Sequence, residues 1–180
     1  GIPVFERAQA WGQIMKSYKN AICISGTHGK TTTTSMMSHI LLAAEKDPTI
    51  SVGGILKAIG GNIRVGSSDV FVTEACEYTN SFLDFFPKIG IILNVEEDHM
   101  DFFKDIDDIR LSFHRFAALL PEDGALIINK NIEKMVSEAK ALKEENDLKI
   151  NEAKDNLLDD YKDVLAKKYV QDLEDLKKEY

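Results

Sequence analysis

A lysine and four threonines follow a glycine-bracketed loop in the stretch AICISGTHGKTTTTS, residues 21–35. The apolar residues before the loop predict a buried strand that ends at Ser25. Backbone N–H groups in such a loop, with the positive end of the following helix, form a site for phosphate oxygens. Lys30 is expected to reach the terminal phosphates, and Thr31 to offer its hydroxyl to Mg²⁺. The predicted phosphate contacts are Gly26, Thr27, His28, Gly29, Lys30, Thr31 and Thr32.

The alternative for this stretch is a Ser/Thr-rich helix start after a tight turn. That alternative does not explain why Gly-Lys-Thr comes directly after a buried strand. The general phosphate-loop pattern expects a glycine five residues before Gly29, where this sequence has Ile24. The loop therefore belongs to a more restricted pattern, G-T-x-G-K-T-T.

Short apolar runs that alternate with amphipathic stretches position this loop. The runs predict strands at 21–25, 49–52, 70–74, 89–94 and 125–129, and the amphipathic stretches predict helices at about 4–18, 30–45, 79–86 and 106–120. This alternation predicts an α/β fold with a mainly parallel sheet and helices on both faces. The glycine-rich segment 53–66 is expected to be a loop or a β-hairpin.

Composition limits the classes of partner. The chain has 180 residues, 44% of them hydrophobic, and a formal net charge of −8, which favours a small phosphate ligand over a nucleic acid. Two cysteines, Cys23 and Cys76, give no disulfide framework, and no apolar run is long enough to span a bilayer. We therefore expect a cytoplasmic protein with no membrane partner. The absence of an initiator methionine suggests an excised piece.

The C-terminal segment 131–180 differs in composition from the rest of the chain. It holds 14 Asp and Glu and 10 Lys and Arg, with no Gly or Pro. Apolar residues recur in it at helical spacing, with a change of phase near 145–148. We expect 1–130 to form one domain and 131–180 a C-terminal helical hairpin that packs on that domain or on itself. A coiled coil used for self-association is the alternative.

Several motifs in order carry a resemblance to a known family. The stretch SGTHGKTTTTSMMSHIL is followed by GGNIRVG at 60–66, TEACEYTNSFL at 73–83, LNVEEDHMDFF at 93–103 and LLPEDGALIIN at 119–129. Together they resemble the central ATP-binding domain of the Mur ligases, most closely their alanine-adding members, which make peptidoglycan precursors. The resemblance covers about residues 1–129 and implies ATP and Mg²⁺ as cofactors.

The resemblance also implies roles for single residues. Glu74 matches a glutamate that binds Mg²⁺, and His99 matches a histidine associated with a second metal ion, so Thr31, Glu74 and His99 are the expected metal ligands. Lys30, Glu74 and His99 are the expected catalytic residues. Asn80 and Ser81 match a loop that faces the UDP-sugar, which makes UDP-N-acetylmuramate the expected substrate.

Other residues receive weaker roles. Asn94, Asp98 and Asp101 are candidates to orient His99 or to hold metal-bound water. Each strand-end or loop residue here also has a purely structural alternative, such as a solvated carboxylate or a helix cap. His39 and His114 are expected on helix surfaces.

The resemblance stops where two substrate sites should follow. Nothing in the chain resembles the family's UDP-binding or amino-acid-binding domains, and Ser112 and Phe113 stand where many members carry a carbamylated lysine. The leading interpretation is the ATP-binding central domain of an acid–amino-acid ligase, which works through an acyl phosphate and does not ligate alone. The alternatives are a non-catalytic truncated or engineered α/β scaffold and an unrelated phosphate-loop kinase or nucleotidase.

Overall fold

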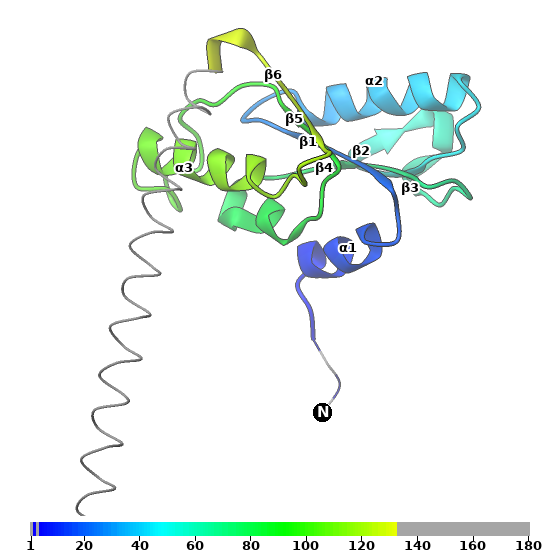
Figure 1. Cartoon of the computed structure of the whole chain (residues 1–180), viewed down its shortest axis with the longest axis horizontal. Helices are drawn as coiled ribbons and strands as arrows, with labels where there is room; N and C mark the ends of the chain where they lie inside the picture. The colour runs from blue at the N-terminus through cyan, green and yellow to red at the C-terminus, as the bar shows by residue number, and fades with distance from the viewer. Residues whose placement is uncertain (1, 3, 133–180) are drawn as a thin grey trace, which may run out of the picture. The chain divides into compact units, whose positions relative to one another are not determined.

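The computed structural model describes residues 2 and 4–132 of the chain, and these form an α/β fold (Figure 1). Its elements in order are α1 (Arg7–Met15), β1 (Asn20–Ser25), α2 (Lys30–Ala43), β2 (Thr49–Leu56), the 3₁₀ turn η1 (Lys57–Ile59), β3 (Gly61–Arg64), β4 (Val70–Glu74), the 3₁₀ segment η2 (Tyr78–Asp84), β5 (Ile89–Ile92), α3 (Ile106–Ala117) and β6 (Ala125–Ile128). The strands form one sheet in the order β3-β2-β4-β1-β5-β6. Every neighbouring pair is parallel except β2 and β3. The predicted fold class is confirmed.

The central strand β1 is buried on both faces because helices cover the sheet from both sides. Figure 1 shows α2 over one face and α1 and α3 over the other. Successive side chains of a strand point to opposite faces, so Cys23 joins the core formed with α1 and α3, whereas Ile22 and Ile24 join the core beneath α2. Cys23 is fully buried in this core, and its burial raises the pKa of its thiol.

The glycine-rich segment 53–66 contributes to a β-hairpin at the sheet edge, formed by β2 and β3. Asp47, at the start of this unit, is the residue that fixes the far end of β3. Its carboxylate accepts hydrogen bonds from the Arg64 guanidinium and, at 2.8 Å, from the backbone N–H of Ser67. The loop before β2 and the loop after β3 are therefore joined.

Two local predictions are wrong. The stretch 79–86 was predicted to be a helix, but η2 is a 3₁₀ segment with a kink, because Thr79 (φ 54°) and Asn80 (φ 58°) adopt the left-handed conformation. His114 is buried, with 6% exposure, because the face of α3 that packs on the core is wide enough to include it beside Phe113. His39 is exposed on α2, as predicted.

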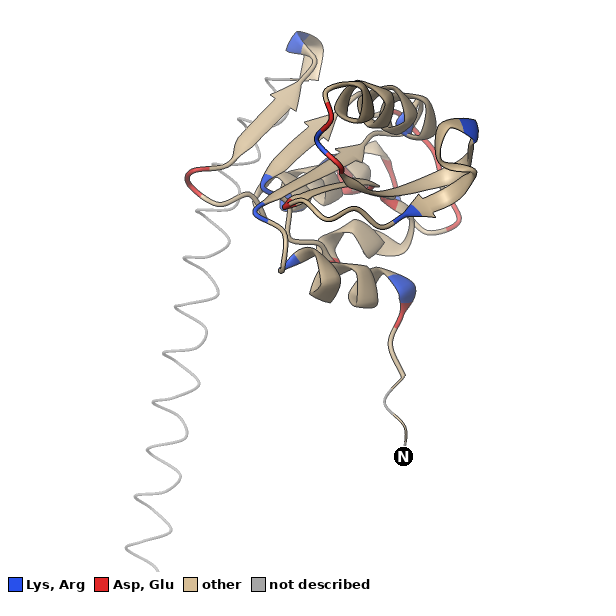
Figure 2. Ribbon diagram, turned by 90° about the vertical axis from the view of Figure 1, so that its right-hand side faces the viewer, with Lys and Arg blue, Asp and Glu red and all other residues tan. Residues whose placement is uncertain are grey.

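The helical hairpin predicted for 131–180 falls almost wholly on residues 133–180, which lie outside the described residues. Among the helices of the described ranges, none combines the length and the apolar character that crossing a membrane requires. Figure 2 shows the charged residues of the described part mainly in loops, on helices and at strand ends, with the middle of the sheet uncharged.

Candidate functional site

The loop between β1 and α2 has the backbone shape of an anion site. Gly26 (φ 138°) and Gly29 (φ 85°) both have positive φ, and Gly29 is the N-cap of α2. A Cβ added at Gly26 would lie 3.0 Å from the Cβ of Leu93, so glycine lets the loop pass close to the end of β5. The loop thus turns directly into the positive end of α2.

Hydrogen bonds tie this loop to the segment that follows β5. The Asn94 side chain brackets the His28 peptide, accepting from its N–H at 2.8 Å and donating to its C=O at 3.0 Å. The hydroxyl of Thr27 accepts from the N–H of Glu96 at 2.9 Å. Hydrogen bonds therefore hold the loop at two successive residues, Thr27 and His28. The hydroxyl of Thr27 stabilises the loop by this contact with Glu96.

The loop's remaining predicted contacts lie near the start of α2. The His28 side chain is 63% exposed, with its Nε2 3.8 Å from a Glu96 carboxylate oxygen. Thr32 is exposed in the first turn of α2. Both side chains are exposed and could contact a phosphate bound at the loop.

Lys30 is folded back onto its own loop. Its Nζ donates to the carbonyls of Gly26 at 2.6 Å and Thr27 at 3.1 Å. It also lies 2.8 and 3.1 Å from the two carboxylate oxygens of Glu77, whose side chain is only 2% exposed. The ammonium therefore has a buried counter-ion from the segment after β4.

Glu74 and Thr31 meet at the same end of the sheet. The Oγ1 of Thr31 donates to Oε2 of Glu74 at 3.1 Å, and the N–H of Gly53 donates to Oε1 of Glu74 at 2.5 Å. Glu74 is the last residue of β4 and Thr31 lies in the first turn of α2, so both oxygens lie at the carboxyl edge of the parallel sheet, where α/β sheets bind ligands. They form a pair of hard oxygen ligands of the kind that Mg²⁺ prefers.

His99 lies beside Glu77. Its Nε2 is 3.9 Å from Oε1 of Glu77, and its ring centroid is 4.6 Å from that of Tyr78. Among the described residues, no hydrogen bond or ion pair joins His99 to Thr31 or Glu74. The same part of the chain has no group of three or more His, Cys, Asp or Glu spaced to hold a metal. The structure thus brings two of the three predicted metal ligands, Thr31 and Glu74, into contact. The third, His99, lies beside Glu77, the carboxylate that pairs with Lys30.

The three residues proposed to support His99, which are Asn94, Asp98 and Asp101, form hydrogen bonds with different partners. Asp98 accepts from the N–H of His99 at 2.7 Å, where His99 itself has φ 52°. Asn94 holds the phosphate loop, as described above. Asp101 accepts from the Tyr78 hydroxyl at 2.8 Å, a hydrogen bond that raises the pKa of Tyr78. Asp98 thus contacts His99 itself, and Asp101 binds the hydroxyl of Tyr78, whose ring lies beside His99.

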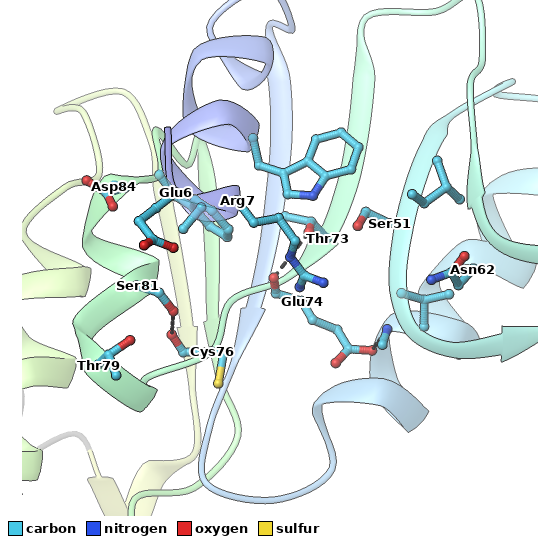
Figure 3. A pocket seen from close by; sticks show the side chains of 16 residues that line it. Glu6, Arg7, Ser51, Asn62, Thr73, Glu74, Cys76, Thr79, Ser81 and Asp84 are labelled. Carbon is cyan, nitrogen blue, oxygen red and sulfur yellow. Dashed lines mark hydrogen bonds between the residues drawn. The ribbon is translucent and has the colours of Figure 1, made fainter. Parts of the chain in front are cut away.

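A pocket of about 320 Å³ opens next to Glu74, between α1, the β2–β3 hairpin and η2 (Figure 3). Ser81 lines this pocket, and its hydroxyl donates to the carbonyl of Cys76 at 3.0 Å. The Asn80 side chain instead accepts from the Ser112 hydroxyl on α3. Of the described residues that line the pocket, Arg7 alone is a cation, and Figure 3 shows its guanidinium extending toward Thr73 and Glu74.

Sequence reasoning missed three residues of this region: Glu77, Gly53 and Arg7. Glu77 lies three residues after Glu74 in TEACE, and this spacing was the available signal for a second carboxylate at the strand end. Gly53 carries no chemistry of its own, so only the fold shows that its N–H meets Glu74. Arg7 precedes the phosphate loop by 19 positions, and no motif around it in the sequence indicates a role in a binding site.

Comparison with known proteins identifies the arrangement. The family model described as the Mur ligase middle domain matches residues 24–177. The UDP-N-acetylmuramate–L-alanine ligase of Lachnospira eligens is 69% identical over 133 residues, which is 74% of this chain and 29% of the relative. The enzyme of the same name from Agathobacter rectalis is 61% identical over 134 residues, again 74% of this chain and 29% of the relative. The chain thus spans less than a third of these curated relatives.

Solved structures agree with this comparison. The UDP-N-acetylmuramate:L-alanyl-gamma-D-glutamyl-meso-diaminopimelate ligase of Neisseria meningitides superposes with a TM-score of 0.70 at 26% identity, over 77% of this chain and 48% of that one. The UDP-N-acetylmuramate-alanine ligase of Thermotoga maritima gives 0.62 at 28% identity, over 74% and 30% of the two chains.

Proposed function

Since the chain belongs to the Mur ligase middle-domain family, we propose that it is the ATP- and Mg²⁺-binding central part of a UDP-N-acetylmuramate–L-alanine ligase. The observation that carries the proposal is the meeting of Thr31 and Glu74 beside Lys30 at the start of α2. A cation site and a phosphate site then share one end of the sheet, as an ATP-dependent ligase requires. The names of the two curated relatives supply the substrate class.

The residues at this site fit both ligands. The N-terminus of α2 and the two glycines offer backbone N–H groups to phosphate oxygens, and Lys30 adds a positive charge. Thr31 and Glu74 would hold Mg²⁺, which supplies charge neutralisation to the phosphates when bound. Asn94 keeps the backbone of the loop in this shape through its two hydrogen bonds to His28, so the loop backbone needs little reorganisation on binding.

The pocket beside Glu74 offers one cation, Arg7, to the acidic end of the sugar substrate, and its serine and asparagine side chains offer hydrogen bonds. The carboxylates of Glu6, Glu74 and Asp84 also line the pocket, so a cation bound at Glu74 would be needed to offset their charge before a carboxylate binds there. The pocket adjoins the Thr31–Glu74 pair, because Glu74 both lines the pocket and accepts the hydrogen bond from Thr31. A carboxylate bound there would therefore lie next to the phosphate site, which is the geometry that acyl phosphate formation needs.

Ligation requires the sugar carboxylate, the phosphate and the amine to be held together. The chain spans 29% of each of the two relatives named above, and the phosphate site with its adjoining pocket supplies part of what these three groups require. We therefore propose that the chain binds ATP and does not ligate alanine by itself. The cytoplasmic location expected from its composition stays a prediction.

Calorimetric titration with a non-hydrolysable ATP analogue, with and without Mg²⁺, tests the proposal. We expect Mg²⁺-dependent binding that is lost in Lys30→Met, while Lys57→Met, on the exposed hairpin, leaves it unchanged. Absence of binding together with concentration-dependent self-association would instead support a non-catalytic scaffold. Incubation with ATP, Mg²⁺, UDP-N-acetylmuramate and labelled alanine completes the test, because Lys30-dependent product would contradict the second part of the proposal.

A further inference from the structure

The ammonium of Lys30 has no donor to spare. It carries three N–H donors, and four acceptors lie within 3.1 Å of Nζ: the carbonyls of Gly26 and Thr27 and both carboxylate oxygens of Glu77. All four acceptors belong to the protein. A phosphate that is to bind Lys30 must therefore displace at least one of them.

Glu77 is the partner that resembles a phosphate. Its carboxylate is anionic and meets the ammonium with two oxygens, whereas the loop carbonyls are neutral and belong to the lysine's own turn. The residue is 1% exposed, and its backbone carbonyl accepts from the N–H of Asn80 at 2.9 Å. The carboxylate is thus buried at the base of the phosphate loop, and the backbone that carries it is hydrogen-bonded in place.

A buried carboxylate and a bound triphosphate compete for the same charge. A buried anion is costly unless a cation compensates it, so Glu77 holds Lys30 strongly, and it also repels any phosphate that approaches the lysine. His99, whose Nε2 lies 3.9 Å from Glu77, is the other titratable side chain in ion-pair range of this carboxylate among the described residues. Glu74 is occupied by Gly53 and Thr31.

We propose that Glu77 is a positioning residue that occupies Lys30 in place of the terminal phosphate and so lowers the affinity of the loop for nucleotide. This inference rests on the proposed function, because it requires phosphate to bind at Lys30. Two consequences follow. Removing the charge of Glu77 strengthens nucleotide binding, and the gain grows with the number of phosphates that reach the lysine.

The test measures the affinity of the whole chain for ATP analogue, ADP and AMP by calorimetry in the presence of Mg²⁺. Four proteins are compared: the wild type, Glu77→Gln, Lys30→Met and the double variant. Glu77→Gln keeps the shape and one oxygen acceptor but loses the charge. We expect it to bind the ATP analogue about tenfold more tightly than the wild type, equivalent to about 1.4 kcal/mol, ADP less so, and AMP with unchanged affinity.

The double variant distinguishes an action of Glu77 through Lys30 from a purely structural role of Glu77. If Glu77 acts through Lys30, Glu77→Gln restores no binding in the Lys30→Met background, because the lysine for which carboxylate and phosphate compete is gone. A merely structural role would change the affinity for all three nucleotides alike when Lys30 is present, and binding regained by the double variant would show that Glu77 does not act through Lys30. Should Glu77→Gln fail to fold, Glu77→Asp replaces it, since its shorter carboxylate reaches the ammonium less closely and is expected to give a smaller gain of the same sign.

Unchanged or weaker binding of the ATP analogue by the folded variant, with a wild type that binds, would overturn the inference and leave the proposed function intact. Equal gains for AMP and ATP analogue would also overturn it. Absence of binding in both the wild type and Glu77→Gln would overturn the proposed function together with the inference. Binding seen only in the variant would support both.

Discussion

The hydroxyl of Thr31 and the carboxylate of Glu74, 43 positions apart in the chain, lie 3.1 Å apart at the start of α2. The other carboxylate oxygen of Glu74 is held by the N–H of Gly53 on β2. Three elements, the phosphate helix and two neighbouring strands, therefore determine where this carboxylate points. Hydrogen bonds from surrounding groups orient a metal-binding side chain before the cation binds.

Gly53→Ala is expected to weaken Mg²⁺-dependent nucleotide binding while leaving the fold intact. A Cβ at Gly53 would lie 2.7 Å from Oε2 and 3.1 Å from Oε1 of Glu74, so the carboxylate must move. Gly54→Ala is the matched control, because its Cβ would lie 3.4 Å from the Thr31 methyl, an ordinary contact. Calorimetry at several Mg²⁺ concentrations should show a loss of about tenfold or more for Gly53→Ala alone; equal affinities for the two variants would contradict this.

Lys30→Met is expected to lose nucleotide binding and also to lower the stability of the fold. The ion pair with Glu77 is largely buried, with side-chain exposures of 15% and 2%, and removing one partner of such a pair leaves an uncompensated charge, at a cost of about 3 kcal/mol. Chemical denaturation at pH 7 measures the loss. In the double variant with Glu77→Gln most of the loss should be recovered, because the lone carboxylate is gone. Equal stabilities of wild type and Lys30→Met would show that the buried pair contributes nothing.

Substitutions of the three predicted metal ligands should differ in effect. Glu74→Gln and Thr31→Ala are expected to reduce the Mg²⁺ dependence of nucleotide binding strongly, since the two side chains contact each other at the phosphate helix. His99→Ala should reduce it less, because His99 lies beside Glu77. Titrations of ATP analogue with and without Mg²⁺ give the coupling for each variant. Thr33→Ala, on the same helix, is the control. A larger loss for His99→Ala than for Glu74→Gln would show that the histidine holds the main cation.

Periodicity predicted the sheet and its covering helices because strands buried on both faces read as continuous apolar runs. AICIS at 21–25 and VFVTE at 70–74 are such runs, and they became the paired strands β1 and β4. The phosphate loop was also predictable, because glycines, lysine and threonine act within a few residues of one another. Local patterns of this kind do not depend on the rest of the fold.

Long-range contacts were less accessible to sequence reasoning. The partner of Lys30 is 47 positions away, and a glutamate in TEACE carries no mark that it is buried. The left-handed pair Thr79 and Asn80 broke the helix predicted there, since neither residue type prevents a helix by itself and Ser112 on α3 supplies a partner for Asn80. His114 was misplaced because apolar spacing alone does not reveal how wide the buried face of α3 is.

Asp47 is expected to make the fold sensitive to acid. Hydrogen bonds from Ser67, and then the Arg64 guanidinium, hold the pKa of the Asp47 carboxyl well below its usual range. A carboxylate with a lowered pKa in the folded state stabilises that state above its unfolded pKa of about 3.9. This contribution is lost as the pH falls from about 4 through the folded pKa. Asp47→Asn should therefore lower the free energy of unfolding at pH 7, and its difference from the wild type should shrink below pH 4.

Urea denaturation from pH 7 to pH 3 measures this difference, and Ser67→Ala is the matched variant. It removes the hydroxyl that donates to Asp47 at 2.5 Å but keeps the backbone N–H that donates at 2.8 Å. Its stability should therefore lie between those of the wild type and Asp47→Asn at pH 7. The hairpin contacts that Asp47 makes through its own carbonyl, which accepts from the Ser68 hydroxyl at 2.9 Å, survive in both variants. A constant difference between the wild type and Asp47→Asn over the whole pH range would mean that the charge of Asp47 does not contribute, and that only the shape of the side chain matters at this turn.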